Sequence, residues 1–167
     1  MHKMDGNFSN QQHPIKIYTD GAARGNPGPG GMGVVMLYGS HRKEISEGYA
    51  HTTNNRMELL AVIRGLEAIK WNNASVVIFT DSKYVADAVN LKWVFGWEKK
   101  EFKKKKNPDL WRRFLELYRK YNVQIEWIRG HSNIPDNERC DELAVEASKR
   151  SSLQEDLGYN ENNFLIC

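Results

Sequence analysis

A helix followed by a strand with a continuous apolar centre is the feature that most constrains how this chain folds. From residue 54 to residue 71, apolar side chains recur at three- and four-residue steps, which is typical of a helix with one buried face. The next segment, Ser75–Thr80, has a continuous apolar centre, which indicates a strand buried on both faces. Because a strand that follows a crossover helix pairs in parallel, this strand requires an earlier partner in the same sheet.

The first strand of the chain is the natural partner. Alternating apolar and polar side chains predict it over residues 15–20, and short loops join it to two more strands, at residues 31–38 and 43–49, as an antiparallel meander. A fifth strand is predicted over residues 123–129. The sequence therefore predicts an α/β fold with a five-stranded mixed sheet, in which three antiparallel strands are followed by parallel additions, flanked by helices.

Most of the remaining chain is expected to be helical or to lie outside the fold. Three further helices are predicted: at residues 82–90, from Asn107 and Pro108 onward, and at residues 137–150. The chain has 167 residues and no evident linker, so it is expected to form a single domain at residues 15–150. A flexible leader is expected at residues 1–14, and a loosely attached tail at residues 151–167.

Composition excludes several classes of protein. No apolar run approaches the ~20 residues that a membrane span needs, so no membrane association is expected. The polar N-terminus lacks the apolar segment of a secretory signal. The two cysteines, Cys140 and Cys167, give neither a disulfide framework nor a metal-binding spacing. A cytoplasmic protein with reduced thiols, and a monomer, is the simplest interpretation.

Four carboxylates occupy positions suited to chemistry. Asp20 and Asp81 end the two strands that are predicted to pair in parallel, and the carboxyl ends of such strands meet at one edge of a sheet. Glu58 and Asp141 lie in the first turns of predicted helices and border the buried faces. If the four converge, their mutual repulsion requires a neutralising cation.

Oxygen ligands without Cys or His suit a hard divalent ion, Mg²⁺ or Mn²⁺. Two such ions can hold the attacking and leaving oxygens of a phosphodiester, which points to metal-dependent phosphoryl transfer to water. Each acid also has a purely structural interpretation. Asp20 fits a turn, Asp81 fits a helix cap, and Glu58 and Asp141 fit the neutralisation of helix dipoles.

His131 lies in a loop that follows the fifth strand, ten residues before Asp141. A lone loop histidine is usually a surface residue. At the rim of a carboxylate cluster, however, it could relay protons, because its usual pKa lies near neutrality.

A basic segment at residues 92–106 carries seven lysines and two acids. Such a run is commonly a solvated loop. Here Trp93, Trp97 and Phe102 interleave with the lysines, a pattern that favours binding of nucleic acid by phosphate neutralisation and stacking. Trp93 and Trp97 could equally pack the base of the segment. The candidate contacts in this segment are Trp93, Trp97, Phe102, Lys103, Lys104, Lys105 and Lys106. Thr53, Asn54 and Asn55 can cap a helix or present hydrogen-bonding groups to a nucleic-acid groove, including to a 2′-hydroxyl.

Several stretches of the chain together resemble the type 1 ribonucleases H, in particular the bacterial ribonuclease HI group. The matching stretches are residues 18–22, 25–31, 52–59, 80–85, 109–111, 127–131 and 137–144, in the family's order. The resemblance implies the ribonuclease H-like fold and hydrolysis of the RNA strand of RNA–DNA hybrids with Mg²⁺, two ions with substrate, which Mn²⁺ can replace. The implied products carry 5′-phosphate and 3′-hydroxyl ends.

The resemblance also assigns roles by position. Asp20, Glu58, Asp81 and Asp141 match the metal-binding carboxylates, and His131 matches the mobile catalytic histidine. Contacts with the hybrid are implied for Gly21, Asn26, Thr53, Asn54 and Asn55, and residues 92–106 match the basic protrusion. Lys83 stands where bacterial relatives often have Gln, so the contact with RNA there is expected to be altered or replaced by a charge contact. Phe102 stands where a third Trp is common.

Two other functions remain open from the sequence. A hybrid-binding module without catalysis would need a degraded metal site, whereas all four carboxylates are present. A related nuclease or strand-transfer enzyme acting on DNA would use the same acids, but residues 53–55 and the basic segment favour a hybrid.

Overall fold

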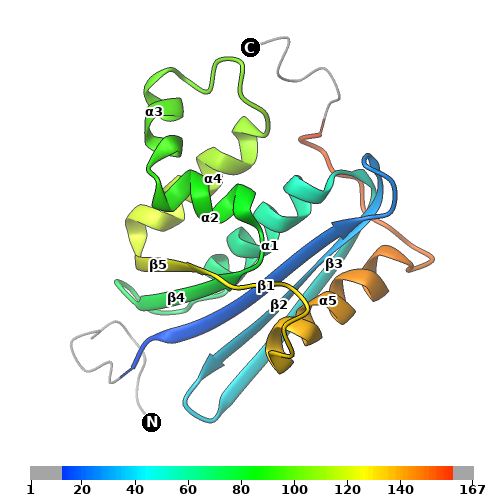
Figure 1. The fold of residues 1–167 in the computed structure, drawn as a ribbon, viewed down its shortest axis with the longest axis horizontal. Coiled ribbons are helices and arrows are strands. Elements are labelled where there is room, and N and C mark those ends of the chain that lie inside the picture. The colour runs from blue at the N-terminus through cyan, green and yellow to red at the C-terminus, as the bar shows by residue number, and fades with distance from the viewer. Residues whose placement is uncertain (1–12, 160–167) are drawn as a thin grey trace.

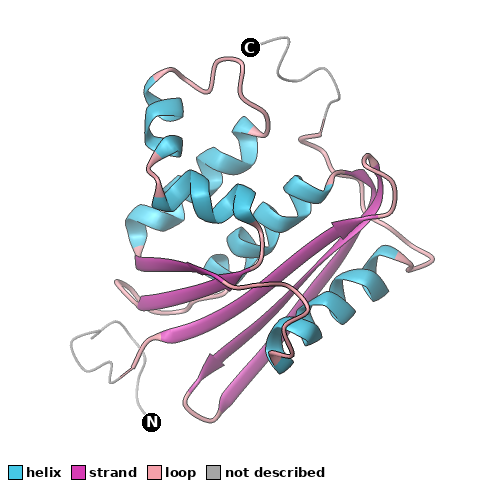
Figure 2. Cartoon of the chain, viewed as in Figure 1, coloured by secondary structure: helices cyan, strands magenta, loops and turns pink. Residues whose placement is uncertain are grey.

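The computed structural model of the chain describes residues 13–159. Its elements in chain order are β1 (Ile15–Ala23), β2 (Gly28–Tyr38), β3 (His41–Thr52), α1 (Asn54–Glu67), β4 (Ser75–Thr80), α2 (Lys83–Asn90), α3 (Trp93–Lys99), α4 (Pro108–Lys120), β5 (Asn122–Trp127) and α5 (Pro135–Ser148). Figure 2 shows how the strands form one continuous sheet between helices. Residues 1–12 of the expected leader and 160–167 of the expected tail lie outside the described part.

The five strands form one mixed sheet in the order β3-β2-β1-β4-β5. β1, β2 and β3 pair antiparallel, and β4 pairs in parallel with both β1 and β5. The pairing of β1 with β4 runs from Ile15 opposite Val76 to Thr19 opposite Thr80. The predicted fold class is therefore confirmed, and Asp20 and Asp81 directly follow the last paired residues of the two central strands.

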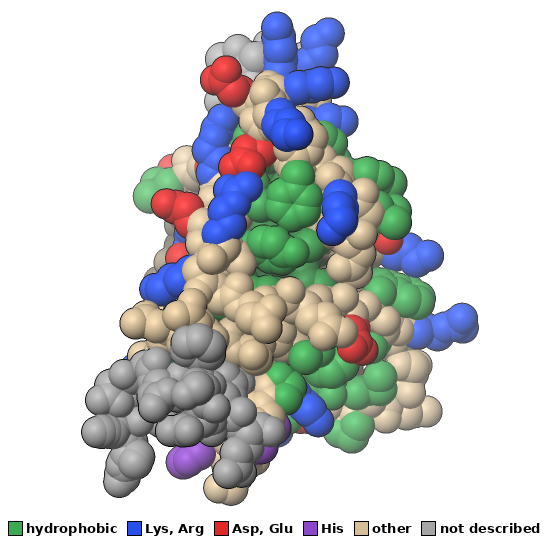
Figure 3. Space-filling model, turned by 90° about the vertical axis from the view of Figure 1, so that its left-hand side faces the viewer, with side chains coloured by type: hydrophobic (Ala, Val, Ile, Leu, Met, Phe, Trp, Pro, Cys, Tyr) green, Lys and Arg blue, Asp and Glu red, His purple; other side chains and the backbone are tan. Residues whose placement is uncertain are grey.

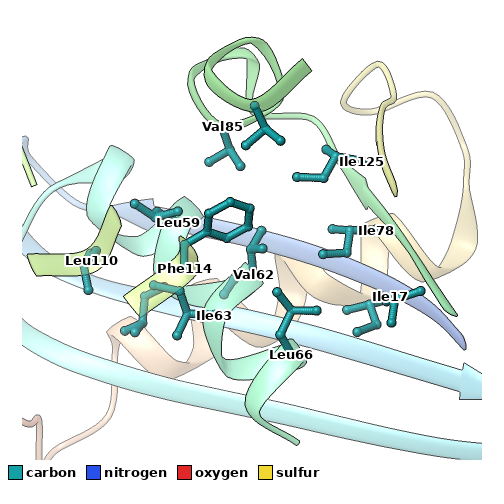
Figure 4. Packing of buried hydrophobic residues seen from close by; sticks show 14 of the residues in the cluster. Ile17, Leu59, Val62, Ile63, Leu66, Ile78, Val85, Leu110, Phe114 and Ile125 are labelled. Carbon is teal, nitrogen blue, oxygen red and sulfur yellow. The ribbon is translucent and has the colours of Figure 1, made fainter. Parts of the chain in front are cut away.

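Helices cover both faces of the sheet. Figure 1 shows α5 packed across β1, β2 and β3 on one face, while α1 lies across the opposite face with α2 and α4 beside it. Figure 4 shows the main core between these layers, where Ile17, Ile78 and Ile125 from three strands meet Leu59 and Phe114 from α1 and α4. Among residues 13–159, no helix is long and apolar enough to span a membrane.

β1 and β2 are longer than predicted, and glycines of β2 lie directly against α5. The predicted strands left residues 21–30 between them, whereas in the structure only residues 24–27 join β1 to β2. A Cβ at Gly31 or Gly33 would collide with the backbone of α5, at Ala144 and Cys140 respectively. These glycines therefore let a helix approach the sheet closely.

The first part of the expected tail is attached to the fold. Ala50 donates a main-chain hydrogen bond to Gln154, and Gln154 donates one to Gly48, which adds a short parallel bridge to β3. The carboxylate of Asp156 binds the guanidinium of Arg56, with 2.7 Å between Arg56 Nε and Asp156 Oδ2. Residues 151–159 thus hold β3 and the start of α1 together, contrary to the expectation of a loose tail.

Candidate active site

Three of the four predicted carboxylates meet where the pairing of β1 with β4 ends. One oxygen from each of Asp20, Glu58 and Asp81 lies within 4.8 Å of the other two. Asp20 is buried, and Glu58 and Asp81 are partly buried. Acids separated by up to 61 residues of chain thus form one cluster.

Glu58 reaches the cluster because α1 packs directly against β1. A Cβ on Gly21 would collide with the backbone of Met57 and Glu58, so only glycine allows this approach. The main-chain N–H of Gly21 donates to Asp20 Oδ1 at 2.9 Å, which orients that carboxylate. Gly21 was predicted to contact the hybrid; in the structure it also sets the distance between strand and helix.

The structural interpretations of these acids do not fit what surrounds them. β1 continues to Ala23, so Asp20 is not a turn residue. The N-cap of α2 is Ser82, whose hydroxyl accepts from the N–H of Val85 at 3.2 Å, so Asp81 is not the cap. Glu58 lies beyond the first turn of α1, where the helix dipole has little effect.

Asp141 likewise lies deeper in its helix than predicted, because α5 begins at Pro135. Asp136 and Glu138 occupy the first turn of α5 and are placed to offset its dipole. Asp141 is not within the group of three. It lies next to them, since its charge and a side-chain hydrogen bond both raise the pKa of Asp20.

Burial and mutual repulsion keep protons on the cluster when no cation is present. Desolvation, followed by the charge of Asp81, raises the pKa of Asp20 to about 8. Desolvation and the charge of Asp20 raise the pKa of Glu58 well above its usual value. The pKa of Asp81 is also raised by burial, while the charge of His131 acts in the opposite direction. His131 is exposed on the loop after β5, and its charge acts on Asp81.

The donor set fits a hard divalent cation. Glu58 Oε1 is buried without any hydrogen-bond partner, and an unpaired buried oxygen of this kind is costly. The three converging groups are all carboxylates, which Mg²⁺ and Mn²⁺ prefer as ligands. A cation bound here would satisfy that oxygen and relieve the repulsion that raises the pKa values.

We expect the metal-free protein to lose stability as the pH rises from about 4 to about 8. Asp20 holds a proton in the folded state up to a pKa of about 8, whereas its usual pKa is 3.8. Between these values the folded state binds more protons than the unfolded state, so the free energy of unfolding falls with rising pH. Urea unfolding in chelator should show that the free energy of unfolding of the unchanged protein falls between pH 5 and pH 8. In Asp20→Asn this fall should be smaller by about 1–3 kcal/mol. Parallel pH profiles for the two proteins would contradict this.

The residues predicted to contact the hybrid surround the start of α1. The hydroxyl of Thr53 caps the helix by accepting from the N–H of Arg56 at 3.2 Å. Asn54 Oδ1 accepts from the N–H of Ala23 at 2.6 Å, and Asn26 Oδ1 accepts from the N–H of Asn54 at 3.0 Å. Asn26, Asn54 and Asn55 are exposed. The amides thus fix the loop between β1 and β2 against the helix next to the cluster.

The basic segment forms a projection that includes the short helix α3, which sequence patterns did not predict. Figure 3 shows Lys and Arg side chains crowded at the end of the molecule where α3 and the loop to α4 lie. A groove of about 290 Å³ is lined by Trp93, Gly96, Trp97, Lys100, Lys103 and Lys105. Lys103, Lys104, Lys105 and Lys106 are exposed, and Lys105 Nζ lies 5.1 Å from the ring centroid of Trp97.

The three aromatic residues of the segment differ in their exposure. Trp93 is 50% exposed and Trp97 is partly buried against Trp111, whereas Phe102 is 1% exposed. Phe102 therefore cannot stack on a base, and its predicted contact with substrate is corrected to a role in the core. A phenyl group within a charged run still favours the interior, because burying it removes apolar surface from water.

Two residues near the site were not singled out from the sequence. Arg56 is buried in the first turn of α1. Trp127 donates from Nε1 to the main-chain carbonyl of Asp81 at 3.0 Å. Both lie inside motifs that match the family. Their contacts, however, join segments 46 to 100 residues apart, which local patterns do not reveal.

Comparison with known proteins identifies what this arrangement resembles. The family model of RNase H matches residues 12–149. "Ribonuclease H" of Syntrophus aciditrophicus (strain SB) is 52% identical over 153 residues, covering 89% of this chain and 88% of the relative. "Ribonuclease H" of Desulforamulus reducens is 49% identical over 159 residues, covering 92% of this chain and 99% of the relative.

Solved structures agree with this similarity. LC9-RNase H1, described as a type 1 RNase H with the type 2 active-site motif, superposes with a TM-score of 0.70 at 30% identity and covers 80% of this chain and 71% of its own. LC11-RNase H1 in complex with RNA/DNA hybrid superposes with a TM-score of 0.58 at 30% identity, covering 80% of this chain and 95% of its own.

Proposed function

The chain belongs to the ribonuclease H family, and we propose that Asp20, Glu58, Asp81 and Asp141 hold the divalent cations that its catalysis needs. It is an endoribonuclease that hydrolyses the RNA strand of RNA–DNA hybrids, as its relatives and the hybrid complex of a structural neighbour indicate. The observation that carries the residue assignment is the meeting of three acids around a buried, unpartnered oxygen of Glu58.

The chain's own residues perform the remaining tasks of the reaction. Two Mg²⁺ ions, or Mn²⁺ in their place, would supply charge neutralisation and an activated water for attack on the phosphate. Asp20, oriented by the N–H of Gly21, and Glu58, fixed in α1, set the position at which the scissile phosphate lies. His131, exposed on its loop, would exchange a proton with the attacking water or with the leaving 3′-oxygen. The products then carry 5′-phosphate and 3′-hydroxyl ends.

Substrate contacts are proposed on both sides of the cluster. Asn26, Thr53, Asn54, Asn55 and Gly21 face the RNA strand beside α1, and the projection with Trp93, Trp97 and Lys103 to Lys106 neutralises phosphates of the DNA strand. We further propose that the protein acts as a monomer, because one chain contributes the whole acidic cluster. A cytoplasmic location is also part of the proposal.

One cleavage assay separates the candidate functions. End-labelled RNA–DNA hybrid, duplex DNA, duplex RNA and single-stranded RNA are incubated with Mg²⁺ or with chelator. We expect cleavage of the hybrid alone, only with Mg²⁺. Binding of the hybrid without cleavage would indicate a module without catalysis, and cleavage of duplex DNA would indicate a DNA nuclease.

The lysines of the projection should control how binding depends on salt. Replacing Lys103, Lys104, Lys105 and Lys106 by Ala removes four exposed cations, so fewer counterions are released when the hybrid binds. The slope of log Kd against log salt should fall by about 2–4, while the turnover of saturating substrate is retained. An unchanged slope would show that these lysines are ordinary surface residues. Lys16→Ala, an exposed lysine on β1, serves as the control.

A further inference from the structure

An exposed tryptophan stands beside the carboxylate cluster and has no role among the predicted site residues. Trp127 is the last residue of β5, pairs with Thr80 at the end of β4, and is 42% exposed. Its indole Nε1–H donates to the main-chain carbonyl of Asp81 at 3.0 Å. The ring is therefore tethered to the backbone of one of the three clustered acids.

Lys83 places its charge over this ring. The ammonium nitrogen lies 4.9 Å from the ring centroid of Trp127, within the range of a cation–π attraction. Lys83 is exposed at the start of α2, two residues after Asp81. Within residues 13–159 it has no carboxylate partner, so its charge is available to a ligand.

We propose that Trp127 positions Lys83 to bind a phosphate of the RNA strand next to the phosphate that is cleaved at the cluster. A strand whose scissile phosphate lies at Asp20, Glu58 and Asp81 would carry an adjacent phosphate past Lys83, because Lys83 begins α2 two residues after Asp81. Trp127 connects the cluster to Lys83, because its indole N–H donates to the carbonyl of Asp81 and its ring attracts the Lys83 ammonium. A lysine held in this way binds with less loss of side-chain freedom than a free one.

The contact would change how substrate affinity responds to salt. A neutral side chain at position 83 can donate a hydrogen bond to RNA without displacing a counterion, whereas an ammonium releases one for the phosphate it neutralises. Trp127 is a positioning residue in this proposal, and Lys83 is the residue that touches substrate. The inference rests on hydrolysis of the hybrid at this cluster.

Steady-state kinetics on a labelled hybrid at several salt concentrations tests the proposal with Lys83→Met, Trp127→Leu and the double variant. Methionine keeps the length of the lysine stem and removes its charge. We expect Lys83→Met to raise KM about 3–10-fold with kcat within about twofold, and to reduce the slope of log KM against log salt by about 0.7–0.9, the value for one phosphate contact. Trp127→Leu should raise KM similarly, and the double variant should be no worse than either single variant.

Lys120→Met is the matched control, because Lys120 Nζ lies 5.4 Å from the ring centroid of Tyr121 at the opposite end of β5. Its KM and salt slope should equal those of the unchanged protein. The proposal is overturned if Lys83→Met leaves KM and the slope unchanged, or if the effects on KM multiply in the double variant. An unsubstituted protein that fails to cleave the hybrid would instead overturn the function itself. Should Trp127→Leu not fold, the salt slope of Lys83→Met still decides the phosphate contact.

Discussion

Asp20→Asn should lower kcat on an RNA–DNA hybrid by at least ~10³-fold, because the amide cannot supply the charge that holds a cation at the centre of the cluster. Asp20 is the most buried of the three clustered acids, and its charge also acts on Glu58. The change is nearly isosteric, so hybrid binding and the fold should be largely retained. Single-turnover cleavage with saturating enzyme measures the chemical step apart from binding.

The same variant should be more stable than the unchanged protein in chelator near pH 8, since it removes one of three mutually repelling groups. Asp136→Asn is the matched control: Asp136 precedes Asp141 in α5 and pairs with Arg42 at 2.9 Å at the surface. It should cleave at the normal rate. Cleavage by a clean preparation of Asp20→Asn at more than a few per cent of the normal rate would overturn the assignment of Asp20.

Arg56→Met should destabilise the protein by about 3–5 kcal/mol, the usual cost of leaving a buried charge without its partner, here Asp156, whose side chain is 10% exposed. The Arg56 side chain is 2% exposed and binds Asp109 and Asp156, each through two of its nitrogens. Its fifth short contact is with Asn107 Oδ1 at 3.3 Å. The guanidinium therefore joins the start of α1 to the start of α4 and to residues 151–159.

Urea unfolding in the presence of Mg²⁺ measures this effect. Arg139→Met is the control, because Arg139 also pairs with two acids, Glu44 and Glu142, but its side chain is 36% exposed. The free energy of unfolding of Arg139→Met should be less than about 1 kcal/mol below that of the unchanged protein. Arg56→Lys should recover only part of the loss, since an ammonium cannot form both bidentate pairs. Equal losses for Arg56→Met and Arg139→Met would show that the buried network adds no special stability.

The sequence predicted the parts of the fold that depend on local pattern. The apolar centre of β4 and the stripe of α1 were enough to predict the parallel pairing that brings Asp20 next to Asp81. The boundaries were less accurate: α1 ends at Glu67 where residue 71 was expected, and the chain after it turns so that Trp71 packs on Tyr38. Such tertiary contacts decide where an element ends, and no pattern within the element contains them.

The site was predictable where strand ends determine it and unpredictable where long-range packing does. Glu58 and Asp20 meet because Gly21 lets α1 approach β1, a contact that sequence alone does not reveal. Phe102 was expected at the surface because of its charged neighbours, although it is buried. The attachment of residues 151–159 depends on Arg56, which lies 100 residues before Asp156.

Calorimetric titration of Mg²⁺ into the protein, and into Asp20→Asn and Glu58→Gln, tests most directly whether the buried acids form a cation site. We predict saturable binding to the unchanged protein and a loss of at least about tenfold in affinity in each variant, because each substitution removes a charged ligand. Asp136→Asn should bind as the unchanged protein does. Equal affinity for Mg²⁺ in all four proteins would contradict the account.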